Sequence, residues 1–213
     1  MKIFLIFLWY LCGILGGYLI GNLNTAAVIA KCKGFDIRQK GSGNAGASNA
    51  LVTMGKGAAA ASALVDILKC FLPVFLLMHA FTLPAGCERL PVVTGIAVIL
   101  GHMYPFWMQF RGGKGFASLL GLTLALDWRF FLAAIAIVVI LLLTVRYIAL
   151  ATITCSALLP FAWYWKSGDL IAAALLLALA VVIISKHIEN LRRMKNGTEI
   201  KFGEKKKEEP DRQ

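Results

Sequence analysis

Residues 3–23, IFLIFLWYLCGILGGYLIGNL, contain no charged side chain and a single side-chain amide, that of Asn22. A helix must supply about 20 consecutive apolar residues to cross the hydrocarbon core of a bilayer. An exposed helix of a soluble protein, in contrast, carries polar and charged residues along one face. This stretch has the length of a span and no such polar face, and it therefore predicts a membrane-spanning helix.

The same kind of stretch recurs along the whole chain. Hydrophobic residues make up 59% of the 213 residues, charged residues make up 15%, and the mean hydropathy is +0.76. Such a composition is typical of a chain with several membrane spans. No alternating pattern competes with the helical one, so we expect an all-α, polytopic membrane protein. The predicted spans are residues 3–23, 58–77, 92–107, 116–126, 130–144, 148–164 and 170–184.

The distribution of charge predicts which loops face the cytoplasm, because lysine and arginine are concentrated on that side of membrane proteins. The loop after the first span has one acid, Asp36, and several cations, namely Lys31, Lys33, Arg38, Lys40 and Lys56. We expect this loop inside and the N-terminus outside. Segment 116–126 is short for a span, but omitting it would move the basic stretch from Lys186 onward to the outside. Charge therefore favours seven short spans.

The loops assigned to the outside are close to neutral. Each of their cations lies near an acid in the sequence, as Arg89 with Glu88, Arg129 with Asp127, and Lys166 with Asp169. The net charge of the whole chain is +11, which in a soluble protein would suggest a nucleic-acid partner. Here the cations flank apolar segments, so we expect contact with membrane lipids and none with nucleic acid.

The chain has the organisation of one transmembrane domain, residues 1–203, followed by a tail of mixed charge, residues 204–213. The composition of the tail predicts disorder. The five cysteines show no CxxC spacing, so neither a disulfide framework nor a metal site is expected.

Three polar clusters fall in loops that this topology places on one side of the membrane. The first, residues 41–49, reads GSGNAGASN. It contains GxGxxG, but no strand precedes it, so a dinucleotide fold is not indicated. Its glycines allow close approach of the backbone to an anion, and Ser42, Gly43, Asn44 and Asn49 supply short hydrogen-bonding groups. A helix starting just after them would add partial positive charge. A flexible linker remains the alternative.

The second cluster combines GHMYP at 101–105 with RGGKG at 111–115. It is not a Walker A loop, because Lys114 is followed by glycine and the upstream glycine spacing differs. Two cations, Arg111 and Lys114, flank the bare backbone of Gly112 and Gly113, which suits a phosphate group. The alternative is a positively charged membrane anchor with a turn, in which His102 only hydrogen-bonds a neighbour.

The third cluster, HIENLRR at 187–193, ends in NGTE at 196–199. On a helix, His187 and Asn190 would share a face, and Gly197 predicts the end of that helix. A basic anchor after the last span is the alternative. Within segment 58–77, Asp66 and Lys69 are three residues apart, and the sequence leaves open whether they form a structural ion pair or take part in catalysis.

Taken together, GSGNAGASNA, GHMYPFWMQFRGGKGFAS and HIENLRRMKNGTE resemble the acyl-phosphate-dependent glycerol-3-phosphate acyltransferases of bacteria. The resemblance extends from about residue 16 to residue 202. It implies a seven-span enzyme of the bacterial inner membrane whose three motif loops form one cytoplasmic active site. It also implies acyl transfer from acyl phosphate to the sn-1 hydroxyl of glycerol 3-phosphate, giving lysophosphatidic acid and phosphate. No cofactor is implied, because a mixed anhydride is already activated, and the enzyme that makes acyl phosphate is a candidate partner.

The resemblance also suggests roles for individual residues. Lys114 and the Gly112–Gly113 amides would stabilise the leaving phosphate. Asn190 would orient the glycerol, and His187 would act as general base unless an oxygen of the acyl phosphate takes the proton itself. The phosphate of one substrate would be held in the first loop. Ser42 is counted with Lys114, His187 and Asn190 among the catalytic candidates. The remaining substrate-binding candidates are Gly43, Asn44, Asn49, Lys56, His102 and Arg111.

Three positions depart from the family pattern. Val52 stands where an arginine is usual, Cys70 where a glycine is usual, and Arg111 replaces the first lysine of KGGKG. Valine can neither donate a hydrogen bond nor carry charge, so we expect weaker binding of glycerol 3-phosphate. Lys56, one helical turn beyond Val52, would partly replace the arginine. Two other functions stay open at this point, a small anion transporter and a membrane scaffold without activity.

Overall fold

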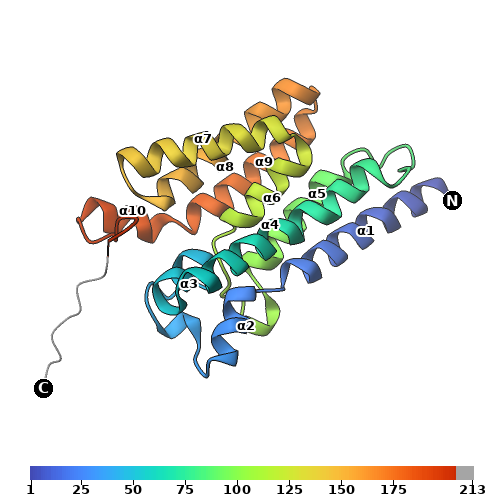
Figure 1. Ribbon diagram of the computed structural model, residues 1–213. Helices are drawn as coiled ribbons and strands as arrows, with labels where there is room; N and C mark the ends of the chain where they lie inside the picture. The colour runs from blue at the N-terminus through green and yellow to red at the C-terminus, as the bar shows by residue number, and fades with distance from the viewer. Residues whose placement is uncertain (205–213) are drawn as a thin grey trace, which may run out of the picture.

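The structure is a computed structural model that describes residues 1–204. The described residues form ten α-helices and two short 3-10 helices, and they contain no strand (Figure 1). The predicted all-α class is therefore confirmed. The predicted charged tail, apart from Glu204, lies outside the described residues.

Seven of the helices are apolar and correspond to the seven predicted segments. Four helices are long and apolar enough to cross a membrane, the bent pair of the last two helices is a fifth candidate, and two others are shorter. Seven crossings and an outside N-terminus stay predictions. The apolar helices are α1 (Lys2–Gly21), α4 (Lys56–His79), α5 (Leu90–Met103), α6 (Phe116–Leu126), α7 (Trp128–Thr144), α8 (Ile148–Ser167) and α9 (Leu170–Ser185).

These helices run side by side along one direction and form a bundle (Figure 1). Helix α6 is short but largely buried, and it packs against α4. Glycines let neighbouring backbones meet: a Cβ at Gly121 would overlap the carbonyl oxygen of Ile67 in α4, and one at Gly101 would overlap that of Tyr18 in α1. Small residues at helix contacts are typical of packing within membranes.

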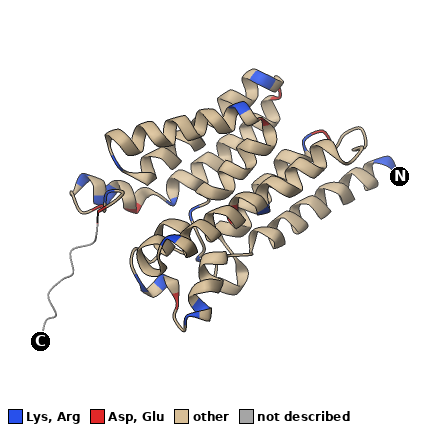
Figure 2. Ribbon diagram, in the orientation of Figure 1, with Lys and Arg blue, Asp and Glu red and all other residues tan. Residues whose placement is uncertain are grey.

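The polar segments gather at the end of the bundle opposite the N-terminus, which we call the motif end (Figure 1). Figure 2 shows that most of the lysines and arginines lie there too. The predicted span 92–107 ends in this region: α5 ends at Met103, the chain turns at Tyr104 and Pro105, and Leu90–Met108 as a whole is long and apolar enough to cross a membrane. The elements of the motif end are α2 (Thr25–Cys32), η1 (Ile37–Gln39), α3 (Ala47–Met54), η2 (Phe106–Met108) and α10 (Ile188–Lys195).

The other end of the bundle, which we call the N-terminal end, has two ion pairs. Arg89 lies 2.7 Å from Asp169, and Lys166 lies 2.8 Å from Asp127. Neither pair joins a cation to the acid nearest to it in the sequence. Asp127 and Asp169 also accept hydrogen bonds from the first amides of α7 and α9, so each acid caps a helix and neutralises a cation.

Candidate active site

The loop before α3 is held by the side chain of Asn49. Its Oδ1 accepts a hydrogen bond from the amide of Ser42 at 2.9 Å, and its Nδ2 donates to the carbonyls of Ile37 and Lys40, each at 3.0 Å. Both amide hydrogens are thereby used inside the protein, and Asn49 is buried. The expected direct contact of Asn49 with substrate is therefore replaced by a different role, in which it shapes the loop.

The helix expected after this loop is present and begins at Ala47. Its N-cap, Gly46, provides no side-chain cap, so the first amides of α3 have no side chain as acceptor. Ser42 and Gly43 are exposed just before this helix start, and Asn44 is half-buried beside it. Exposed hydroxyl and amide groups next to an uncapped helix N-terminus can bind an anion.

The glycine loop between α5 and α6 differs from the prediction. The amide of Gly112 donates to the carbonyl of Met103, and that of Gly113 to the carbonyl of His102, both at 3.1 Å. The proposed use of these two amides for a substrate phosphate is therefore wrong for this conformation. Helix α6, which follows the loop, has Gly115 as its N-cap and no side-chain cap, so its first turn is the alternative source of amide donors.

His102 lies beneath this loop and is only 2% exposed, and the Nε2 side of its ring faces Gly113, so its contact with substrate stays a prediction. The sequence alternative, in which His102 hydrogen-bonds a neighbour, is the one that the structure supports. Its Nδ1 lies 2.9 Å from the ammonium nitrogen of Lys69.

Lys114 connects the second cluster to the third. Its ammonium group donates a hydrogen bond to Oδ1 of Asn190. Asn190 in turn donates through Nδ2 to Glu199 at 2.6 Å, and Glu199 accepts from Arg193 at 2.6 Å. This chain of contacts places a lysine, an arginine and one carboxylate at a single point of the motif end.

The pKa of Lys114 falls to about 8 in these surroundings. Burial of the ammonium group is the largest cause, and the positive charges of Arg193 and Lys186 add to it, while Glu199 acts in the opposite direction. An anion bound here would relieve this repulsion between cations.

His187 is the N-cap of α10 and is 3% exposed. Its Nδ1 lies 2.8 Å from the carbonyl oxygen of Ile183, which can only accept, so Nδ1 carries the proton and Nε2 has the lone pair. Burial lowers the pKa of His187, and the nearby charge of Lys114 lowers it further. The imidazole is therefore neutral near pH 7, the form that a general base requires.

The region of the first cluster is joined to that of the second by side chains that bind backbone carbonyls. Asn24 donates to the carbonyl of Ala45 at 2.9 Å, and Arg38 donates to the carbonyl of Met108 at 2.8 Å while pairing with Asp36. The first bond ties the segment before the first cluster to Ala45 within it, and the second ties η1 to η2, which lies between the two parts of the second cluster.

Two of the predicted cations, Lys56 and Arg111, are exposed, and among the described residues neither forms a side-chain hydrogen bond or ion pair. The expected relation of Lys56 to Val52 is wrong. Helix α3 ends at Met54, and Gly55 has a φ of 89°, so Lys56 begins a new helix instead of lying one turn further on.

The structure adds residues to which the sequence assigned no role. Glu199 and Arg193 complete the contacts of Asn190, and Lys186 lies 4.1 Å from the ring of Tyr104. The predicted helix stop at Gly197 was the sequence feature that indicated these contacts, because the chain folds back there and brings Glu199 toward α10. The partners themselves could not be predicted from spacing.

Comparison with known proteins identifies the family. The family model for glycerol-3-phosphate acyltransferase matches residues 11–197. The chain belongs to the glycerol-3-phosphate acyltransferase family. The relative of that name in Geotalea daltonii is 41% identical over 191 residues, which is 89% of this chain and 95% of the relative. The one in Thermotoga petrophila is 39% identical and covers 91% of this chain and 96% of its own.

Solved structures of the same family share the fold. A crystal structure of PlsY, described as an integral membrane glycerol 3-phosphate acyltransferase in its glycerol 3-phosphate form, superposes with a TM-score of 0.83. The identity is 32%, and the match covers 91% of this chain and 96% of that one. A second structure, in the lysophosphatidic acid form, gives a TM-score of 0.79 at the same identity.

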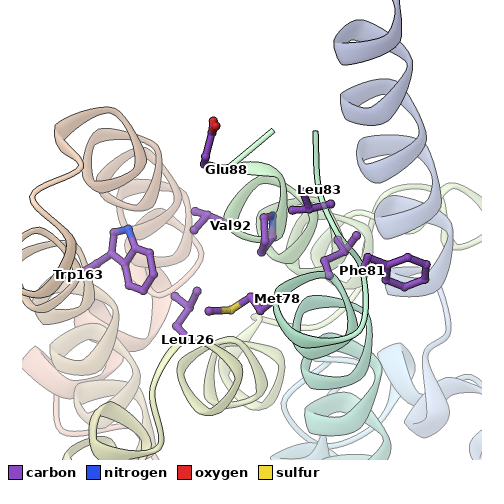
Figure 3. Close-up of a pocket in the computed structure, with 9 residues that line it drawn as sticks. Met78, Phe81, Leu83, Glu88, Val92, Leu126 and Trp163 are labelled. Carbon is purple, nitrogen blue, oxygen red and sulfur yellow. The ribbon is translucent and has the colours of Figure 1, made fainter. Parts of the chain in front are cut away.

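A cavity of about 330 Å³ lies elsewhere, between α4, α5, α6 and α8 toward the N-terminal end. Figure 3 shows Met78, Val92, Leu126 and Trp163 around it, with Glu88 at its edge. None of the predicted site residues lines this cavity. The polar groups that suit phosphate are thus separate from it, in the loops of the motif end.

Proposed function

We propose that this chain transfers a fatty acyl group from acyl phosphate to the sn-1 hydroxyl of glycerol 3-phosphate. The observation that carries the proposal is the contact of Lys114 with Asn190, which joins the second and third motifs, with Lys114 close enough for its charge to lower the pKa of His187. Family membership supports it, because the relatives are named for this acceptor. Lysophosphatidic acid and inorganic phosphate would be the products, and the reaction would begin phospholipid synthesis.

On the donor side, the bond that breaks joins the acyl carbon to a phosphate oxygen. The leaving phosphate gains charge, which the Lys114 ammonium and the uncapped start of α6 are suited to stabilise. The sequence has no HxxxxD motif of the kind used by acyltransferases that take other donors. Acyl phosphate is a mixed anhydride, so the proposed reaction needs neither a metal nor an organic cofactor.

On the acceptor side, Ser42, Gly43, Asn44 and the start of α3 would hold the phosphate of glycerol 3-phosphate. The sn-1 oxygen forms the new bond to the acyl carbon, and its proton must leave. Nε2 of His187 has the lone pair and the neutral state to accept that proton. Asn190 would align Lys114, with which it is already in contact, and orient the glycerol from the same position.

The role of His187 as base can be separated from its role as an anchor. In His187→Asn, the side-chain NH2 can replace the Nδ1 donor to Ile183, but no basic nitrogen remains. A loss of kcat of about a hundredfold or more supports the base, since general base catalysis contributes about 10²–10⁴-fold. A loss below about tenfold would instead assign proton removal to a phosphate oxygen of the donor.

We further propose that the motif end faces the cytoplasm of a bacterial inner membrane. The excess of lysine and arginine at this end supports that orientation (Figure 2). It would also allow an enzyme that makes acyl phosphate to deliver its product directly from the cytoplasmic side.

Thiol labelling of intact spheroplasts tests the orientation. Cys87, on the opposite side by prediction, is buried and makes a poor target, but Ala85 beside it is exposed, as is Cys32 at the motif end. With the other cysteines replaced, an impermeant reagent should label Ala85→Cys in intact cells and Cys32 only after permeabilisation. The reverse pattern would place the site outside.

The activity test uses purified protein in detergent with synthetic palmitoyl phosphate and glycerol 3-phosphate. We expect phosphate release that requires both substrates, together with formation of lysophosphatidic acid. A transporter or an inactive scaffold would give no product. Equal or faster turnover with palmitoyl-CoA would refute the proposed donor while leaving the acceptor in place.

A further inference from the structure

A buried ionic cluster lies directly beneath the glycine loop. Asp66 and Lys69 of α4 are 2.7 Å apart, and Nδ1 of His102, at the end of α5, is 2.9 Å from Lys69 and 3.4 Å from Asp66. The side chains of all three are 3% exposed. Nδ1 of His102 faces Lys69 and the Nε2 side of its ring faces Gly113, so we expect the role of this cluster in the reaction to be indirect.

Lys69 also binds the end of α1. Its ammonium group donates to the carbonyl of Gly21 at 3.1 Å and to that of Leu23 at 2.6 Å. Carbonyls at a helix C-terminus lack partners within the helix, so a buried ammonium group satisfies them and is satisfied by them. The cluster therefore fixes the ends of α1 and α5 relative to α4.

These contacts determine the orientation of the His102 ring. An ammonium group only donates, so Nδ1 accepts from Lys69 and the ring proton is on Nε2. The Nε2 side of the ring faces Gly113 so closely that a Cβ at Gly113 would overlap it. The same loop hydrogen-bonds through its amides to the carbonyls of His102 and Met103. The turn that leads to Lys114 thus packs against the His102 ring.

The presence of charged side chains inside the helix bundle, at Asp66 and Lys69, needs an explanation. A buried ion pair is weak evidence for stability, because a well-packed apolar replacement is often as stable. Ionisable groups inside membrane segments are costly and usually serve a function. Here the functional loop is in contact with the cluster.

We propose that His102 is a positioning residue for acyl transfer, held by the Asp66–Lys69 pair and supporting the Gly112–Gly113 turn so that Lys114 is directed at the substrate phosphate. The proposal rests on the function proposed above for Lys114. It predicts that disturbing the support changes kcat more than it changes the binding of glycerol 3-phosphate.

A double-mutant cycle between positions 113 and 102 tests the contact. Gly113 does not have a positive φ, so alanine fits its backbone and Gly113→Ala adds only the overlap with the His102 ring. His102→Asn keeps an acceptor for Lys69 and removes the Nε2 side of the ring. Gly113→Ala should lower kcat by about tenfold or more in the parent and by less than about threefold in the His102→Asn background, a coupling expected only of residues in contact.

Gly112→Ala is the matched control. A Cβ at Gly112 would overlap the backbone carbonyl of His102 and the ring of Pro105, which a side-chain change at position 102 cannot relieve. The loss caused by Gly113→Ala should therefore be smaller in the His102→Asn background, and the loss caused by Gly112→Ala should be the same in both backgrounds. Equal losses for Gly113→Ala in both backgrounds, or full activity of Gly113→Ala in the parent, would overturn the proposal.

Asp66→Asn tests the lower part of the cluster, with kcat measured per folded enzyme after size exclusion. If Asp66 acts through His102, Asp66→Asn lowers kcat in the parent and adds little to His102→Asn. Additive losses in the two backgrounds would contradict the chain of contacts. If the parent itself released no phosphate, the proposed function would fail, but the coupling of positions 102 and 113 could still be measured as the thermal stabilisation produced by inorganic phosphate.

Discussion

The charged side chains at the two ends of the helix bundle have different kinds of partner. At the N-terminal end, Arg89 and Lys166 each pair with an acid from a distant part of the chain, and those acids also cap helices. At the motif end, Lys114 is in contact with a neutral amide, and helices α3, α6 and α10 begin without a side-chain cap.

This difference separates structural charge from functional charge. At the N-terminal end, Arg89 and Lys166 are already paired and the starts of α7 and α9 are already capped, so these groups have little left to offer a ligand. The motif end holds Lys114, Lys186 and Arg193 close enough to lower the pKa of Lys114, an arrangement that costs free energy until an anion binds. The positions of these lysines in the sequence do not show which of them are paired with an acid, so the sequence alone does not distinguish the structural lysines of one end from the functional lysines of the other.

The largest expected effect comes from removing the central cation of the motif end. Lys114→Ala should lower kcat by about 10²–10³-fold, the usual loss when one preorganised contact to developing charge is removed. Lys166→Ala is the matched control, because Lys166 is a lysine paired with Asp127 at the opposite end. It should keep near-parent activity, measured as phosphate release per folded enzyme. Equal losses in both variants would mean that the two ends do not differ in function.

The pH dependence of activity is a second test of the difference between the two ends. Because Lys114 acts as a cation and its pKa is about 8, its contribution to activity should be full below that pH and decline as the pH rises through it. Arg193→Met should move this decline to higher pH, since the charge of Arg193 lowers the pKa of Lys114. The shape of kcat/KM against pH measures this independently of enzyme amount.

Arg192→Met is the control for that shift. Arg192 is exposed and paired with Glu189, and its charge is not among the causes that lower the pKa of Lys114. A profile unchanged in Arg193→Met, or shifted equally in both variants, would remove Lys114 as the titrating group.

The positions of the apolar helices could be predicted from the sequence, because hydropathy and the distribution of charged residues are independent indications of a membrane span. Segment 116–126 has too few residues for a usual span, yet it is a helix with the bounds that the sequence predicted. The parity of basic loops supported it. The break at Gly55 was missed, because a glycine with positive φ ends one helix and starts the next without any polar interruption.

The site was predictable in composition but not in hydrogen bonding. The residue types of the three loops indicated phosphate, but sequence cannot show whether a glycine amide faces a ligand or a carbonyl. The amides of Gly112 and Gly113 and the side chain of Asn49 are all used within the protein. The pairing of Arg89 with Asp169 was likewise out of reach, since 80 residues separate them.

Val52→Arg tests whether the motif end lacks a cation. Val52 lies on α3 and is 57% exposed, so an arginine fits there without a clash. A hydrogen bond to a charged group contributes about 1.5–3 kcal/mol, so KM for glycerol 3-phosphate should fall by about tenfold or more, with little change in kcat. Val28→Arg on α2, where Val28 is 43% exposed, is the control for added charge at the same end.

Inactivation by Val52→Arg would mean that the site has been adapted to a different acceptor. An equal fall in KM for Val28→Arg would show a general electrostatic effect with no specific contact. Because Gly55 separates the two helices, Lys56→Ala should not depend on whether position 52 is valine or arginine.

The smallest effect is expected at the N-terminal end, where Asp127→Ala removes both the cap of α7 and the partner of Lys166. Loss of an N-cap costs about 1 kcal/mol, and a partly exposed ion pair adds at most about as much. The thermal midpoint in detergent should therefore fall by about 2–4 °C per kcal/mol, while kcat and KM stay within about twofold of the parent because no contact links Asp127 to the motif loops. Asp127→Ser keeps a capping oxygen without the charge and should recover most of the lost stability if the cap dominates. A loss of activity larger than the loss of folded protein would show that the two ends are coupled and would break the distinction between them.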